Sequence, residues 1–288
     1  MPLLEWIPYE IEEKILMYLS PDNIRTIGKD NVSEYVWCRK KHRSIDNAAR
    51  DGNLIGLRYL AEICGDNIHI YNDEALRLSA ENGHLEIVQY LVGRGANINL
   101  ANGYALHYSA GNGHLEVVKY LIEHGADIQI GEWSLWASAK NGHLEVVKYL
   151  VEHGANLYAK ALTISASNGH IWIVKYLVEK CCVDINSTYA LHYSADNGHL
   201  EVVRYLVERG ADIHKDKEAA LVTSAARGQL EVVKYFIEEC GADIYANDNG
   251  VLRYSVIYGH LHIVKYLAER GANIQDIDNL YHTFSDNE

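Results

Sequence analysis

A pattern of apolar and polar positions recurs along most of the chain. In residues 115–123, Glu116, Lys119 and Glu123 form one narrow polar stripe at helical spacing, whereas the other positions are mostly apolar. The shorter segment 105–111 also carries apolar and small residues at helical spacing. The pattern predicts a helix, a turn and a second helix. The second helix is too apolar to be stable unless neighbours cover it.

A glycine motif, Asn-Gly-His-Leu-Glu or a close variant, separates the two predicted helices and recurs every 27 to 31 residues. Its glycines are Gly52, Gly83, Gly113, Gly142, Gly169, Gly198, Gly228 and Gly259. A further glycine, such as Gly125, follows the second helix, where a left-handed backbone commonly ends helices. Stacked copies bury each other's apolar faces, so residues 43–288 are predicted to form an all-α solenoid of about eight helix-turn-helix repeats. Residues 279–282 look like the start of a ninth first helix that caps the stack.

The repeated sequence Asn-Gly-His-Leu-Glu-Val-Val-Lys-Tyr-Leu resembles the ankyrin repeat, and it is similar to the large ankyrin families of giant DNA viruses. This resemblance implies a curved helical stack with projecting turns, or fingers, that binds other proteins without catalysis. The chain departs from the family at the finger. The family's Thr-Pro-Leu-His opening appears without proline, as in Gly-Tyr-Ala-Leu-His at residues 103–107, and the period is shorter than the usual length of roughly 33 residues. We therefore expect blunted fingers rather than full β-hairpins.

Composition and charge narrow the possible partners. Acidic residues outnumber basic ones 39 to 26 in the 288-residue chain, and the formal net charge of -13 disfavours a nucleic acid backbone as partner. No apolar run is long enough for a membrane span, so we expect neither an anchor nor a signal peptide. The five cysteines lack Cys-x-x-Cys spacing, and they suit a reducing compartment better than a disulfide framework or zinc ribbon. We expect the cytoplasm, which would be the host's if the chain is viral.

Residues 1–42 break the period and contain every proline, so they are predicted to be a separate small helical unit. The run from Trp6 to Asp22 resembles the opening of an F-box, in which Leu-Pro-x-Glu precedes an Ile-Leu-x-x-Leu helix and a Pro-Asp turn. The resemblance implies docking to the Skp-type adaptor of a cullin-RING ubiquitin ligase. The implied apolar contacts are Ile7, Pro8, Ile11, Ile15 and Leu19. The alternative is a cap that only covers the first repeat.

Histidine and tyrosine recur at fixed repeat positions, and stacking explains both. The histidines are His84, His114, His143, His170, His199 and His260. The tyrosines are Tyr59, Tyr90, Tyr120, Tyr149, Tyr176, Tyr205, Tyr235 and Tyr266. Because stacking spaces these side chains one repeat apart, we expect no metal site, no cofactor and no enzymatic activity. Each tyrosine ring is predicted to cover the seam between repeats with its hydroxyl in water. The polar stripe is predicted to hold ion pairs at both i, i+3 and i, i+4.

Positions that vary between repeats are the candidates for binding a partner. On the first helix of the third repeat, His107, Tyr108 and Gly111 are predicted to share an outward face. The candidates on the concave side of the stack are Tyr104, Tyr108, Trp133, Trp136, Lys140, Tyr189, Tyr193 and Asp196. Aromatic side chains are enriched at energetic hot spots, although these rings could instead only pad shortened fingers.

These observations lead to one principal hypothesis and one alternative. The principal hypothesis is a monomeric receptor that links a protein captured by the repeats to a ubiquitin ligase through residues 1–42. The alternative is a stand-alone scaffold or competitive inhibitor that has no ligase adaptor.

Overall fold

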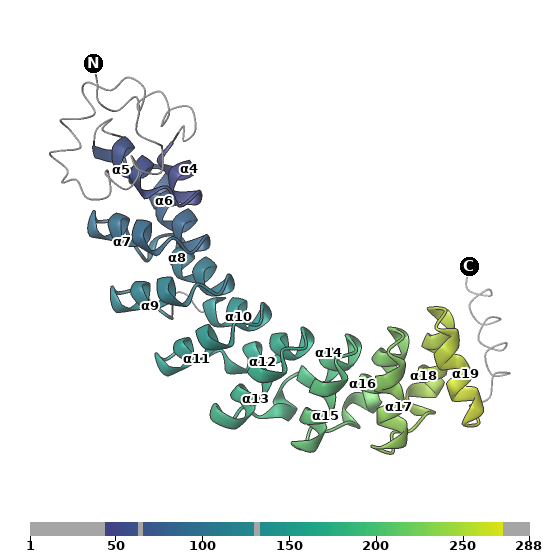
Figure 1. Cartoon of the computed structure of the whole chain (residues 1–288). Helices are drawn as coiled ribbons and strands as arrows, with labels where there is room; N and C mark the ends of the chain where they lie inside the picture. The colour runs from purple at the N-terminus through teal and green to yellow at the C-terminus, as the bar shows by residue number, and fades with distance from the viewer. Residues whose placement is uncertain (1–43, 63–65, 130–132, 273–288) are drawn as a thin grey trace, which may run out of the picture. The chain divides into compact units, whose positions relative to one another are not determined.

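The computed structural model describes residues 44–62, 66–129 and 133–272. Within these ranges sixteen α-helices form eight pairs, accompanied by one short 3-10 helix and no strand (Figure 1). The all-α repeat architecture predicted from the sequence is therefore confirmed. Both the F-box-like segment, residues 1–42, and the proposed cap, residues 279–282, lie outside the described residues.

Each pair consists of a first and a second helix. The first helices are α4 (Ile45–Arg50), α6 (Ile70–Glu81), α8 (Leu100–Gly111), α10 (Trp133–Lys140), α12 (Tyr158–Ser167), α14 (Ala190–Asp196), α16 (Lys215–Ala226) and α18 (Ala246–Ile257). The second helices are α5 (Leu54–Glu62), α7 (Leu85–Gly93), α9 (Leu115–Glu123), α11 (Leu144–Glu152), α13 (Ile171–Lys180), α15 (Leu200–Glu208), α17 (Leu230–Glu238) and α19 (Leu261–Glu269). The 3-10 helix η1 (Ile185–Ser187) precedes α14.

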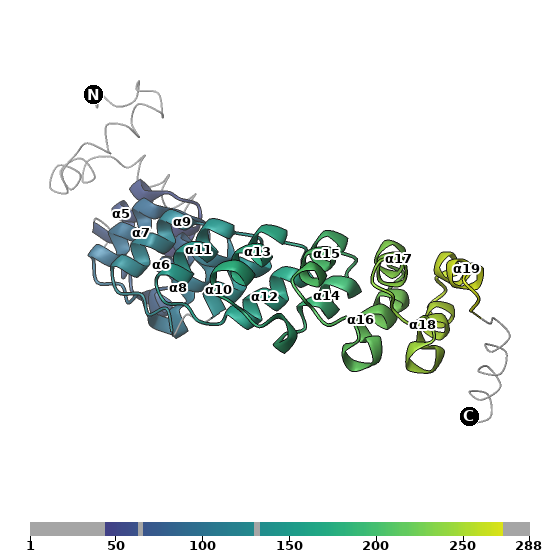
Figure 2. The same ribbon diagram turned by 90° about the horizontal axis from the view of Figure 1, so that it is seen from below.

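The helices belong to two compact units. The first unit contains the described residues up to 138 together with 145–155, and the second contains 139–144 and the described residues from 156 onward. Within each unit, first helices pack on first helices and second helices pack on second helices, which gives two rows (Figures 1 and 2). In the second unit, for example, α14 packs on α16 and α16 on α18, while α15 packs on α17.

Small residues allow the first helices to approach each other closely. Leu106, Ser109 and Ala110 are fully buried, as their helical spacing predicted. The Ser109 hydroxyl donates a hydrogen bond of 3.1 Å to the Leu106 carbonyl within its own helix, so burial leaves no unpaired hydroxyl. The equivalent serines that do the same are Ser79, Ser138, Ser165, Ser194 and Ser224.

The second helices bury an apolar ridge and expose the predicted polar stripe. Val118 and Leu121 are fully buried, and burial of such a side chain contributes roughly 1.5 to 3 kcal/mol. Lys119 pairs with Glu116 at 2.7 Å, as predicted for i, i+3. The predicted i, i+4 partner, Glu123, forms no ion pair within the described part of the chain. A lysine at this position satisfies its single ammonium group with the nearer carboxylate.

Arg204 also departs from the predicted pairing. Its guanidinium does not bind Glu201 in its own helix but reaches Glu239 in the next repeat, with hydrogen bonds of 2.9 and 2.7 Å. The longer, forked arginine side chain can bridge two repeats with a bidentate contact, which the lysines of the other stripes do not do. The polar stripe therefore also contributes to stacking.

In three of the repeats the finger is a short left-handed turn, and no finger among the described residues forms a strand, so the expectation of blunted fingers is confirmed there. Ala101, Asn102 and Gly103 have φ of 51°, 60° and 71° immediately before the regular part of α8. Residues 216–218 and 247–249 repeat this conformation. One side chain also joins successive fingers. The Asn99 side chain donates a hydrogen bond to the Gly125 carbonyl at 2.9 Å and accepts one from the backbone N–H of Asp127 at 2.8 Å.

Cys182 occupies the position that a glycine fills after most second helices, and its φ is 50°. A left-handed conformation costs a residue with a Cβ about 1 to 2 kcal/mol. We therefore predict that Cys182→Gly raises the melting temperature by about 2 to 4 °C. Differential scanning calorimetry tests this, with Cys181→Gly as the control because Cys181 has φ of -95°. An unchanged melting temperature for Cys182→Gly would show that the strain is absent.

Candidate protein-binding surface

The recurring histidines join successive repeats through contacts with backbone carbonyl groups. His114 Nε2 lies 2.9 Å from the carbonyl oxygen of Glu81, the last residue of the preceding first helix. That carbonyl has no partner within its own helix, so the imidazole satisfies it. The same contact recurs in both units for His84, His170, His199 and His260, and Gln229 makes a comparable one at 3.3 Å. The structural interpretation of this ladder is supported by its geometry.

The recurring tyrosines also join repeats, but the prediction that their hydroxyls lie in water is wrong for several of them. The Tyr205 hydroxyl donates to Glu179 of the preceding repeat at 3.1 Å, and Arg209 binds the same carboxylate at 2.8 Å. Tyr90 and Tyr266 make the equivalent contacts with glutamate and arginine. Burial, reinforced by the hydrogen bond to Glu62, raises the pKa of Tyr90 to about 12. These rings therefore belong to the stack rather than to a binding site.

Four of the predicted partner-binding residues lie in the first unit, on α8 and α10. Tyr104 and Trp133 are 45% and 54% exposed, whereas Tyr108 and Trp136 are half-buried. Tyr104 contacts Tyr108 edge-on, with ring centroids 5.6 Å apart, and Trp133 contacts Trp136 likewise at 5.9 Å. In each pair the half-buried ring supports the exposed one. The side chains of a rigid aromatic pair lose little conformational entropy on binding, so this surface suits a protein partner.

His107 lies beside these aromatic pairs. Burial lowers the pKa of His107, and its hydrogen bond to the Trp133 backbone opposes that shift. A lowered pKa keeps the imidazole neutral at pH 7, so the surface around Trp133 remains uncharged at this point. Gly111 is buried rather than outward-facing, so the exposed face of this repeat is narrower than predicted.

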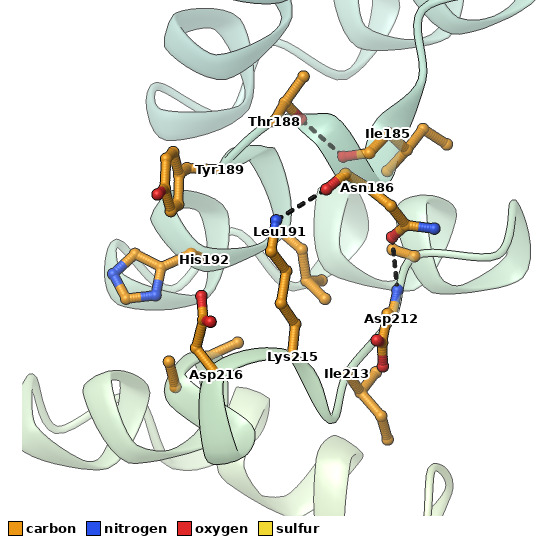
Figure 3. Close-up of a pocket in the computed structure, with 13 residues that line it drawn as sticks. Ile185, Asn186, Thr188, Tyr189, Leu191, His192, Asp212, Ile213, Lys215 and Asp216 are labelled. Atoms are coloured by element: carbon orange, nitrogen blue, oxygen red, sulfur yellow. Dashed lines mark hydrogen bonds between the residues drawn. The ribbon is translucent and has the colours of Figure 1, made fainter.

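The other predicted residues, Lys140, Tyr189, Tyr193 and Asp196, belong to the second unit. Tyr189 and Tyr193 are 57% and 42% exposed, and their ring centroids lie 6.3 Å apart. Lys140 is exposed at the end of α10. The Asp196 carboxylate is paired with Arg227 at 3.0 Å, so it is less available to a partner than the sequence suggested. Tyr189 also borders a water-sized pocket between α14 and α16 (Figure 3).

Sequence reasoning missed a depression of about 330 Å³ between α16 and α18. Tyr254 and Tyr258 line one side of it, and Tyr258 is 60% exposed. Tyr258 stands where five of the other repeats have the asparagine of the Asn-Gly-His motif. The tyrosine at this motif position was the signal in the sequence that could have identified the depression.

Comparison with known proteins gives the family. The model for ankyrin repeats (3 copies) matches residues 45–132, 94–161, 135–217 and 191–278. These overlapping matches span more than half of the chain, and the chain belongs to the ankyrin-repeat family. Ankyrin repeats mediate protein–protein interactions, so the exposed aromatic residues of the first helices define a candidate binding surface for a protein. A search of curated proteins gives no match.

Two further findings bear on other kinds of site. Nowhere in residues 44–62, 66–129 and 133–272 do three histidine, cysteine or acidic side chains gather closely enough to hold a metal ion. None of the helices within the same ranges has the length and apolar character needed to cross a bilayer.

Proposed function

We propose that this chain captures a protein on the surface formed by its first helices and fingers. One contrast between the two rows of helices supports the proposal. The first helices and fingers expose aromatic rings such as Tyr104 and Tyr189. The second helices mostly expose ion-paired stripes, such as Lys148 with Glu145, and Trp172 is the one exposed aromatic ring among their described residues. Exposed aromatic rings supply binding energy at interfaces, whereas exposed ion pairs supply little.

We further propose that the chain is a substrate receptor, in which residues 1–42 dock a Skp-type adaptor and present the captured protein to a cullin-RING ubiquitin ligase. The support is the F-box-like sequence from Trp6 to Asp22, with Ile7, Pro8 and Ile15 among the adaptor contacts. The receptor acts as a monomer in the cytoplasm and uses no cofactor. The alternative function is a stand-alone scaffold or competitive inhibitor, in which the same residues only cap the first repeat.

The Trp133–Trp136 pair provides the test of protein capture. We predict that changing both residues to alanine weakens partner binding at least tenfold, because loss of an aromatic hot spot commonly costs about 2 kcal/mol or more. The measurement is quantitative affinity capture of the bound protein from cell extract by immobilised chain. Circular dichroism would verify that the helices remain.

A matched control exists on the other row of helices. Trp172 is 67% exposed on α13, at a position where five other repeats carry glutamate. Trp172→Ala removes a comparable exposed ring from the second-helix side, so it should leave capture unchanged. Equal capture by wild type and the Trp133/Trp136 variant would move the binding surface away from α10.

A further inference from the structure

One seven-residue sequence occurs twice among the first helices, once in each compact unit. Tyr-Ala-Leu-His-Tyr-Ser-Ala forms residues 104–110 in the first unit and residues 189–195 in the second. The alanine, leucine and serine positions recur in most repeats and are buried between the helices. The two tyrosines and the histidine differ, because no other repeat carries all three at these positions. Stacking therefore does not require this recurring set.

The rings have nearly the same arrangement in the two copies. Tyr104 meets Tyr108 with centroids 5.6 Å apart and an interplanar angle of 74°, and Tyr189 meets Tyr193 at 6.3 Å and 66°. The histidine between them meets the second tyrosine edge-on, at 5.1 Å in the first copy and 5.3 Å in the second. Each unit thus presents one Tyr-His-Tyr surface, formed by Tyr104, His107 and Tyr108 or by Tyr189, His192 and Tyr193.

The hydroxyl groups of these four tyrosines make no hydrogen bond to any residue that the structure describes. The tyrosines of the second helices differ in this respect, since the Tyr205 hydroxyl donates to Glu179. Lys215 lies over the Tyr189 ring at 5.3 Å, but with this cation in place the ring remains 57% exposed. Each surface therefore combines exposed apolar ring area with hydroxyl groups that are free to donate hydrogen bonds.

Charged side chains that border the two surfaces are mostly paired within the chain. On the preceding first helix of the first unit, Arg77 binds Glu74 and Glu81, each at 2.6 Å. In the second unit, Asp196 directly follows the recurring residues, and Arg227 binds it at 3.0 Å. The recurring residues themselves include no aspartate, glutamate, lysine or arginine. Charge complementarity therefore favours a partner segment that is itself uncharged.

Asp216 is an unpaired charge beside the second copy. Its carboxylate is directed toward His192 and Tyr189 across the pocket between α14 and α16 (Figure 3). This pocket of about 30 Å³ has room for a water molecule but not for a side chain. Asp216 belongs to a finger and is not one of the recurring residues, so recognition that both copies share does not use its charge.

We propose that each Tyr-His-Tyr surface binds an uncharged, proline-rich segment, so that one chain binds two such segments. Proline has no N–H, and a polyproline II segment has no internal hydrogen bonds, so its backbone offers acceptors rather than donors. The free tyrosine hydroxyls can donate to these carbonyls while the aromatic rings pack against the proline rings. The segment is already extended, so ordering it costs little free energy. This inference rests on the proposed capture of a protein and specifies the segment that is recognised.

The test uses nuclear magnetic resonance of the intact, isotope-labelled chain titrated with N-acetyl-hexaproline amide. An N-acetylated, amidated Gly-Ser peptide of the same length is the control ligand, because it has backbone carbonyls but no proline rings. We expect saturable shifts of the Tyr108 and Tyr193 amide resonances with hexaproline, with dissociation constants on the order of 1 mM, and none with the Gly-Ser peptide. Tyr104→Ala should abolish the shift of Tyr108 alone, and Tyr189→Ala that of Tyr193 alone.

Tyr258→Ala is the matched control variant. Tyr258 is 60% exposed, but its ring stacks on Tyr254 with an interplanar angle of 21° and does not belong to a Tyr-His-Tyr surface. This variant should therefore retain both sets of shifts. Equal shifts with the two peptides, shifts in one unit only, or loss of binding in Tyr258→Ala would overturn the inference. Such a result, together with a capture defect in the Trp133/Trp136 variant, would leave the proposed function intact and remove only its proline-rich ligand.

Discussion

Gly83→Ala is expected to destabilise the array by about 2 to 4 kcal/mol. Gly83 has φ of +77°, and a Cβ at this position would lie 2.5 Å from Nδ1 of His114 in the next repeat. The left-handed conformation accounts for about 1 to 2 kcal/mol. The remainder comes from overpacking and from the weakened hydrogen bond between His114 and the Glu81 carbonyl. The measurement is the free energy of unfolding in urea.

Gly95→Ala is the control for this prediction because it separates backbone strain from contact between repeats. Gly95 lies in the same repeat with φ of +93°, but a Cβ there would meet no atom within 4 Å. The free energy of unfolding of Gly95→Ala should therefore fall only by the cost of placing a Cβ on a left-handed backbone. Equal destabilisation by the two alanine variants would mean that the histidine contact does not hold the repeats together.

The sequence was sufficient to predict the elements of the fold because each of them is repeated. The recurrence of residues such as His114 and Tyr205 indicated a role in stacking, and both residues join neighbouring repeats. Their partners could not be predicted, since the Glu81 carbonyl and the Glu179 carboxylate come from a preceding repeat. A helical projection places the Tyr205 ring at the edge of its own helix, but it contains no information about the carboxylate that accepts a hydrogen bond from its hydroxyl.

The candidate surface was less predictable than the fold. Tyr104 and Trp133 were identified from their variation between repeats, and both are exposed. Asp196 was identified by the same reasoning, but its ion pair with Arg227 depends on a residue 31 positions away. Tyr258 was missed because the motif assigned its position to a turn. Variation shows which positions stacking leaves free, whereas exposure and pairing depend on neighbouring repeats.

The second large effect is expected at the N-terminus. Replacing Pro8 and Ile15 with glutamate should abolish binding of the intact chain to a Skp-type adaptor, because the F-box-like interpretation assigns both side chains to an apolar interface. Charges buried at such an interface without partners are strongly unfavourable. Glu13→Lys is the control, since it changes the charge of the same predicted helix at a polar position and should preserve binding. Similar loss of binding in the Pro8/Ile15 variant and in Glu13→Lys would contradict an apolar interface at Pro8 and Ile15.

Isothermal titration calorimetry of the intact chain with a Skp-type adaptor tests the receptor proposal most directly. The proposal predicts saturable one-to-one binding by the wild type and by Glu13→Lys, with no binding by the Pro8/Ile15 variant. Absence of binding by the folded wild-type chain would contradict it. That result would favour the alternative, in which residues 1–42 only cap the first repeat. The protein would then act as an ankyrin-repeat scaffold or inhibitor that has no ligase adaptor.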